Sequence, residues 1–251
     1  MKIAYYKEYS HFLQIEMEFK VYGHAGKPCL VFPAQDGRFY DWENFRMVEV
    51  TDYLLEEVRL QYFCVDSIDR ETWSDQYGDP RGRALRHEAW YPYVVAALVP
   101  RIYEINTLSN GGKVASGILT TGCSMGGMHA ANFFFRRPDL FDGCISLSGV
   151  FNSRMFFGDY MDDIIYNNAP EVYLRNLAND HPYVDLYNRS YIVLCCGQGA
   201  WEDEMIASSK EMKRILEEKG IHAWIDFWGY DVNHDWPWWQ KQLPYFLEKI
   251  V

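Results

Sequence analysis

A serine stands between two glycines in the stretch Gly122-Cys123-Ser124-Met125-Gly126. A strand-like run, "GILTTGCS", leads into it and a helical run, "MGGMHAANFFFRR", follows it. Because no spacer separates the serine from either run, a strand must turn directly into a helix at Ser124. Such a junction strains the backbone, and glycines two residues before and two after remove side chains that would collide there. The stretch therefore predicts a strand–turn–helix unit. The alternative is a tight turn with an inert serine.

The rest of the chain alternates short apolar runs with longer helical ones. Residues 12–23 alternate with period two and predict one or two antiparallel strands at the start. Pro92 and Pro100 are expected to start, kink or end parts of one helical run, and Pro244 is a candidate break in the last one. The other predicted strands cover 28–34, 60–67, 117–123, 142–150, 190–199 and 221–230, and the helices cover 88–106, 125–137, 203–220 and 236–250.

This alternation predicts an α/β protein with a mostly parallel central sheet, antiparallel edge strands at the N-terminus and helices on both faces. The sequence contains no internal repeat, no low-complexity tract and no linker rich in Pro, Gly and Ser. We therefore expect a single domain over residues 1–251.

Charge excludes two classes of partner. Lys and Arg total 24 against 35 Asp and Glu, a formal net charge of −11. Nucleic acids and anionic membrane surfaces both need clustered positive charge, so neither is expected as a partner. The chain also lacks an apolar run of transmembrane length and a signal-peptide pattern at its start. We expect a soluble, cytoplasmic protein.

The cysteines do not indicate a metal site. All six lie in or beside apolar, strand-like runs, which favours buried reduced thiols over a disulfide framework or a metal centre. Adjacent residues of a strand point to opposite faces, so the paired cysteines at 195 and 196 are unsuited to share one metal. No G-x-G-x-x-G follows an early strand, so no dinucleotide cofactor is expected either. The six are Cys29, Cys64, Cys123, Cys144, Cys195 and Cys196.

A serine nucleophile needs a base, and the base needs an orienting acid. In folds with this type of turn the chain order is serine, acid, histidine. Of the seven histidines, His234 lies in the loop "GYDVNHDW", between the last predicted strand and the last helix. From there a base can reach over the carboxyl edge of the sheet. The alternative is a surface histidine that caps the final helix.

Candidates for the acid follow the strand "YIVLCC", in the loop "GQGAWEDE". We prefer Glu202, with Asp203 as the alternative. The competing interpretation, an acidic first turn favoured by the helix dipole, applies to at least one of Glu202, Asp203 and Glu204. Asp235 is adjacent to His234 in the sequence, so its side chain is poorly placed to orient that ring.

At these motifs the chain resembles the esterase family of the α/β-hydrolase fold that includes S-formylglutathione hydrolases, feruloyl esterase domains, enterochelin esterases and mycolyl-transferring mycobacterial antigens. The matching pieces are "GCSMGG", "CGQG" with an acidic residue after it, and "NHDWPWWQKQLPYF". The likeness runs from about residue 16 to residue 246. It implies Ser124 as nucleophile and His234 as general base. The family acid is Asp or Glu, so the choice between Glu202 and Asp203 stays open.

The resemblance also implies an oxyanion hole. The family places one of its backbone amides in the loop after an early central strand, here "PAQDGRFYDWENF". Gly37 lets the backbone approach closely, and the N–H of Arg38 is the preferred donor, with Phe39 as its replacement. The N–H of Met125 joins it. The alternative for this loop is an ordinary glycine turn.

Together these residues predict an esterase that cleaves a small-molecule carboxylic ester through a catalytic triad and an acyl-enzyme. Acyl transfer to an alcohol or sugar acceptor is one alternative. A non-catalytic binding module is another, although the complete Ser-His-acid set argues against it. Residues 151–189 are rich in aromatics and form either a short lid or pocket wall, or packed core. An exposed aromatic patch would favour a homo-oligomer.

Overall fold

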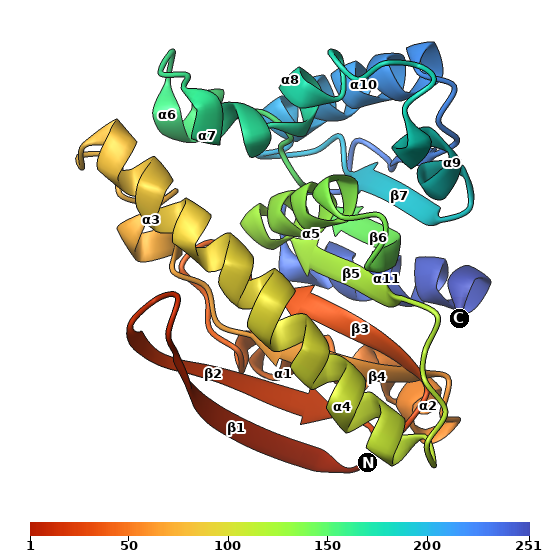
Figure 1. Cartoon of the computed structure of the whole chain (residues 1–251). Coiled ribbons are helices and arrows are strands. Elements are labelled where there is room, and N and C mark those ends of the chain that lie inside the picture. The colour runs from red at the N-terminus through yellow and green to blue at the C-terminus, as the bar shows by residue number, and fades with distance from the viewer.

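Eight strands form the central sheet of the computed structural model, which describes residues 1–251 (Figure 1). The strand order is β1-β2-β4-β3-β5-β6-β7-β8. β1 pairs antiparallel with β2, and β2 with β4, whereas the other neighbouring pairs are parallel. The predicted fold class is confirmed. The strands are β1 (Ile3–Ser10), β2 (Ile15–Tyr22), β3 (Lys27–Phe32), β4 (Leu60–Val65), β5 (Ile118–Cys123), β6 (Phe141–Leu147), β7 (Tyr191–Cys196) and β8 (Trp224–Phe227).

The first strand was not predicted from the sequence. β1 forms the outer edge of the sheet, and of its residues only Ser10 is buried. An edge strand that buries so little carries no clear apolar alternation, so its sequence, "IAYYKEYS", does not stand out.

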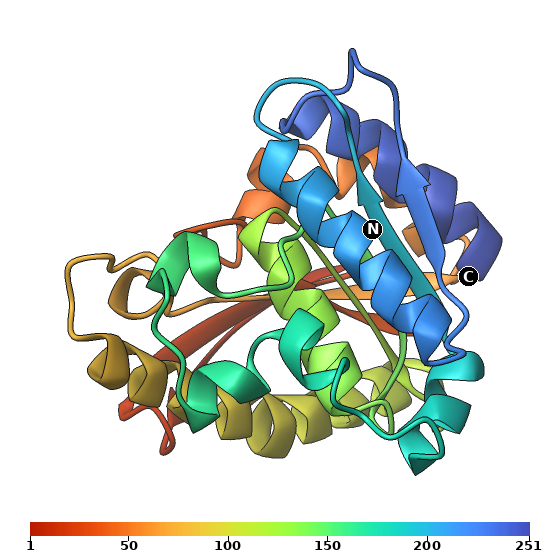
Figure 2. The same cartoon turned by 90° about the horizontal axis from the view of Figure 1, so that it is seen from above.

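Helices cover both faces of the sheet (Figures 1 and 2). In β3, Leu30 and Phe32 point to the face covered by α3, α4, α5 and α10, while Cys29 and Val31 point to the face covered by α1, α2 and α11. This alternation divides the core into two layers. The helices are α1 (Asp41–Asn44), α2 (Asp52–Glu56), α3 (Pro80–Pro92), α4 (Val99–Ser109), α5 (Met125–Arg136), α6 (Arg154–Phe157), α7 (Asp163–Asn167), α8 (Pro170–Tyr173), α9 (Pro182–Asn188), α10 (Asp203–Glu218) and α11 (Trp236–Ile250), with short turns η1 (Glu49–Thr51) and η2 (Asp69–Glu71).

The prolines act differently from one helix to another. α3 begins at Pro80 and continues through a π-helical turn, η3 (Tyr93–Leu98), into α4. Pro92 directly precedes that turn, and Pro100 is the second residue of α4, so the π-helical turn lies between the two residues that lack a backbone donor. The expected break at Pro244 is wrong, because α11 runs through it.

All six cysteines are buried and free, as expected. Cys195 packs in the layer beneath α11, and Cys196 packs on the opposite face against Met205, so the two thiols are turned apart. Burial raises the pKa of Cys144 and of Cys196 to about 12, which keeps these thiols protonated and unreactive at neutral pH. None of the helices combines the length and apolar character needed to cross a membrane.

The end of β3 packs backbone against backbone on the start of α5. A Cβ atom added to Gly126 would lie 2.3 Å from the carbonyl oxygen of Phe32 and 2.5 Å from that of Pro33. One added to Gly122 would lie 2.4 Å from the carbonyl carbon of Gly126. The two glycines that flank Ser124 therefore allow the strand, the turn and the neighbouring strand end to approach more closely than any side chain permits.

We predict that Gly126→Ala destabilises the protein. Overpacking of this kind typically costs about 1–3 kcal/mol. For a domain of this size that corresponds to a fall in the melting temperature of roughly 2–12 °C. Differential scanning calorimetry measures it. The control is Gly82→Ala in α3, where the nearest atom to the new Cβ is a side-chain oxygen of Asp79 at 3.1 Å. Equal melting temperatures for the two variants would contradict the close-packing explanation.

Candidate active site

Ser124 occupies the sharp turn between β5 and α5. Its backbone angles, φ 58° and ψ −123°, lie outside the regions that a serine normally adopts. The Ser124 N–H donates to the carbonyl oxygen of Leu147 at 2.8 Å, which ties the turn to the end of β6. The next amide, the N–H of Met125, opens α5, where a backbone donor has no partner within the helix and no side chain caps it. The turn thus presents a hydroxyl beside a free backbone donor.

His234 reaches Ser124 from the loop between β8 and α11. Its Nε2 lies 2.9 Å from the Ser124 Oγ. The loop is fixed to the one after β7, because the His234 N–H donates to the Ala200 carbonyl oxygen at 3.0 Å and the Ala200 N–H donates to the Asn233 side chain at 2.8 Å. The imidazole is therefore held between two loops that are joined to each other.

Glu202 lies behind the imidazole and is almost completely buried, with 1% of its side chain exposed. Its Oε1 accepts from the Ser148 hydroxyl at 2.6 Å and from the Gly197 N–H at 3.2 Å. Its Oε2 lies 3.5 Å from the His234 Nδ1. The Glu202 Oε2 and the His234 Nδ1 are both buried and have no other hydrogen-bond partner, so they are available to bond to each other. Such contacts often shorten only when substrate binds.

The other acidic candidates lie elsewhere. Asp203 is exposed in the first turn of α10, where the helix dipole favours a negative charge. Asp235 caps α11 and accepts from the Trp236 N–H at 2.7 Å. The structure therefore brings Ser124, His234 and Glu202 together and leaves Asp203 and Asp235 at helix starts.

The loop after β3 differs from the prediction for Arg38. The Arg38 N–H donates to the Asp41 carboxylate at 3.0 Å, and the Phe39 N–H donates to Asp66 at 2.9 Å. Both amides are thus occupied by carboxylates of the protein, and neither residue lines the pocket that contains Ser124. Gln35 lines that pocket, and its N–H has no acceptor within the protein. Gln35 replaces Arg38 as the loop's candidate donor.

The pocket at Ser124 has a volume of about 210 Å³. Apart from His234 its walls carry no ionisable side chain, and four of the lining residues are methionines. Methionine side chains are flexible and polarisable, so such a wall adapts to apolar groups of different shape. The lining residues are Gln35, Ser124, Met125, Met128, Ser148, Val150, Met155, Phe156, Trp201, Met205 and His234.

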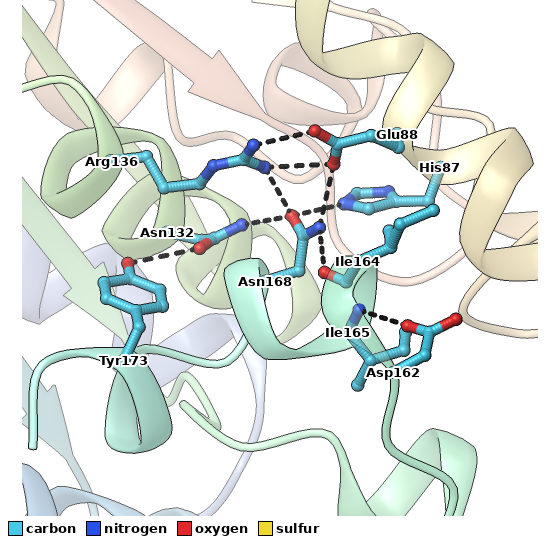
Figure 3. A network of polar contacts seen from close by, with 9 residues as sticks. All are labelled: His87, Glu88, Asn132, Arg136, Asp162, Ile164, Ile165, Asn168 and Tyr173. Carbon is cyan, nitrogen blue, oxygen red and sulfur yellow. Dashed lines mark hydrogen bonds and ion pairs between the residues drawn. The ribbon is translucent and has the colours of Figure 1, made fainter. Parts of the chain in front are cut away.

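Residues 151–189 contribute both wall and core. Met155 and Phe156 of α6 line the pocket, whereas Phe151 lies in the main hydrophobic core. The segment is tied to α3 and α5 through Asn168, at the end of α7 (Figure 3). Its Oδ1 accepts from Asn132 at 2.8 Å, from Arg136 at 2.9 Å and from His87 at 3.1 Å.

This network constrains how the segment can move. Burial lowers the pKa of the His87 ring well below its ordinary value, so the ring is neutral at pH 7. Asn168 also donates to Glu88 at 3.0 Å and to the Ile164 carbonyl oxygen at 2.9 Å (Figure 3). Because the Asn168 amide is 2% exposed and its hydrogen-bonding capacity is used, this arrangement favours a fixed pocket wall over a mobile lid.

Three residues of the site were not identified from the sequence. Ser148 and Gly197 hold Glu202, and Gln35 offers a free amide. Their positions carried a usable signal, because Ser148 and Gly197 directly follow β6 and β7 and Gln35 lies three residues after β3, all at the same edge of the sheet. Their residue types gave no signal of a functional role, since a lone serine, glycine or glutamine in a loop has many uses.

A family model described as "Putative esterase" matches residues 10–250 of the chain. No curated protein sequence matches it.

Solved structures share the fold over nearly the whole chain. A ferulic acid esterase has a TM-score of 0.75 at 15% identity, with 100% of this chain and 98% of that chain covered. An S-formylglutathione hydrolase from Agrobacterium tumefaciens has a TM-score of 0.70 at 14% identity, with 99% and 95% covered. A ferulic acid esterase from Anaeromyces mucronatus has a TM-score of 0.69 at 11% identity, with 99% and 90% covered. At such identities the likeness establishes the fold alone.

Proposed function

The chain belongs to the putative esterase family, and from this premise we propose that it hydrolyses carboxylic esters of small molecules with Ser124 as nucleophile, His234 as general base and Glu202 as the orienting acid. The observation that carries the proposal is the 2.9 Å contact between the His234 Nε2 and the Ser124 Oγ. That contact has the length of a hydrogen bond, which is what proton transfer from a nucleophile to its base requires.

In the first half of the reaction the Ser124 Oγ attacks the ester carbonyl carbon while its proton passes to the His234 Nε2. The tetrahedral intermediate then collapses, the bond to the alcohol oxygen breaks, and the alcohol leaves with the proton from Nε2. Water repeats the sequence on the acyl-enzyme and releases the acid. Glu202 keeps the Nδ1 of the imidazole protonated, so that Nε2 is free to accept.

We assign the oxyanion hole to the backbone N–H groups of Met125 and Gln35. The free amide in the first turn of α5 and the free amide in the loop after β3 support this assignment. The positive end of the α5 dipole adds to the stabilisation of negative charge. Loss of one donor in such a hole typically costs about 10²–10³ in rate.

The pocket supports a neutral, apolar acyl group. Its walls offer thioether, aromatic and aliphatic surface and no cation to pair with a charged acyl chain. Since its volume is about 210 Å³, short and medium acyl groups fit better than long chains.

We predict that wild-type protein hydrolyses p-nitrophenyl acetate and that Ser124→Ala lowers kcat/KM by about 10³-fold or more. A fluorophosphonate probe is expected to label the wild-type protein on the peptide that contains Ser124, as read by mass spectrometry, and to leave Ser124→Ala unlabelled. Undiminished turnover in the folded variant, or an adduct at another residue, would contradict the assignment of the nucleophile.

The acid is tested by a matched pair of variants. We expect Glu202→Gln to lower kcat by about 10³–10⁴-fold, because a carboxamide supports the wrong tautomer of the imidazole. Asp203→Asn, one residue away on the exposed side of α10, is expected to keep kcat within about twofold of wild type. Steady-state kinetics on one ester measures both. The reverse result would assign the role to Asp203.

Acyl-chain preference tests the pocket. Across p-nitrophenyl esters from acetate to decanoate, we expect kcat/KM to be highest at short or medium chains and to fall for decanoate. Phe156→Ala enlarges the pocket, so the decanoate-to-acetate ratio of kcat/KM should rise by about tenfold. Equal kcat/KM for all chain lengths in the wild type would contradict a confining pocket.

A further inference from the structure

A buried serine and a tryptophan lie behind the proposed triad. Ser148 follows β6 at the carboxyl edge of the sheet, is completely buried and has a φ of 53°, which is unusual for a residue other than glycine. Trp239 lies in the first turns of α11 and is 3% exposed. Its indole Nε1 donates to the Ser148 Oγ at 3.0 Å.

The chemistry of these groups determines the direction of each hydrogen bond in the series from Trp239 through Ser148 to Glu202. An indole N–H can only donate, so the Ser148 oxygen must accept from Trp239. A serine hydroxyl carries one proton, and the remaining partner of Ser148 is the Glu202 Oε1 at 2.6 Å. Glu202 is therefore the acceptor at Oε1, where the Gly197 N–H also donates at 3.2 Å.

The direction of these bonds extends to the base. With Oε1 occupied by two donors, the Glu202 Oε2 is left facing the His234 Nδ1, which has no other partner. A carboxylate oxygen at that position favours a proton on Nδ1 and leaves the lone pair on Nε2, toward the Ser124 hydroxyl. The Trp239 and His234 rings also pack in a T-shaped arrangement, at 5.0 Å between ring centroids and an interplanar angle of 86°.

We propose that Trp239 and Ser148 are positioning residues that act together as a directional relay, which orients Glu202 and thereby selects the His234 tautomer that accepts a proton from Ser124. This inference rests on the proposed function for its kinetic consequence. The relay itself is a property of the ground state of the protein. The Trp239 ring packs against His234, and its N–H is linked to Glu202 through the Ser148 hydroxyl.

The kinetic test uses Ser148→Ala, Trp239→Phe and the double variant. A hydrogen bond to a charged group is worth roughly a 10- to 100-fold change in an equilibrium. We expect Ser148→Ala to lower kcat by about 10- to 100-fold with KM within about twofold of wild type. Trp239→Phe is expected to lower kcat less than Ser148→Ala does. The double variant is expected to lower kcat no more than Ser148→Ala alone, since both substitutions interrupt the same series of hydrogen bonds. Independent, multiplicative losses would overturn the relay.

Two controls separate the relay from packing. Ser209→Ala removes a serine that is 1% exposed in α10 and makes no hydrogen bond to Ser124, His234 or Glu202. Trp90→Phe removes a completely buried indole whose N–H has no partner. Both controls are expected to keep kcat within about threefold of wild type, because neither interrupts a bond to the acid. If Trp90→Phe lowers kcat as much as Trp239→Phe does, the fall in kcat is caused by the loss of ring volume, and the relay is overturned.

A measurement independent of turnover reads the tautomer directly. In protein with ¹⁵N-labelled histidine, we expect the His234 ring to carry its proton on Nδ1 in the wild type and to show a mixture of Nδ1–H and Nε2–H in Ser148→Ala and Trp239→Phe. An unchanged tautomer in both folded variants would overturn the relay even if the wild type hydrolyses esters. A changed tautomer with no wild-type hydrolysis would support the relay and contradict the proposed function. If Ser148→Ala does not fold, Trp239→Phe decides the outcome.

Discussion

The site depends on the backbone contact between the end of β3 and the start of α5. Because Gly126 has no side chain, the first turn of α5 can lie against the carbonyl oxygens of Phe32 and Pro33. This contact sets the angle at which the chain leaves Ser124 and holds that residue in its strained conformation. It also brings the loop that carries Gln35 beside the free amide of Met125. One close approach thus positions the proposed nucleophile and both proposed oxyanion donors.

Parallel strands explain why residues so far apart in sequence meet. The turn at Ser124, the residue after β6, the loop after β7 and the loop after β8 all follow carboxyl ends of neighbouring parallel strands. Such ends lie at one edge of the sheet, so each crossover returns the chain to the same place. Hydrogen bonds between the last two loops then fix the imidazole relative to the acid. The sheet supplies the proximity and the loops supply the orientation.

The sequence predicted those parts of the molecule that local pattern determines. The junction at Ser124 and the succession of strands from β2 to β8 follow from apolar periodicity and from glycine spacing. That succession pointed to the loops that carry His234 and the two acidic candidates, Glu202 and Asp203. The Arg38 amide was not predictable, because its occupation depends on the side chain of Asp41 a turn later. Ser148 and Trp239 were missed for a related reason, since their roles exist only once β6 and α11 are packed together.

The choice between Glu202 and Asp203 shows how a single position along the chain determines which carboxylate meets the base. Glu202 is the N-cap of α10, and its side chain turns into the protein to meet Ser148 and His234. Asp203 is the first residue of the helix, where successive side chains are rotated by about 100°, and it faces solvent. Neither the amino-acid composition nor the helix dipole distinguishes Glu202 from Asp203. Burial beside donors that reach only Glu202 separates this proposed orienting acid from Asp203, whose charge lies at the start of a helix.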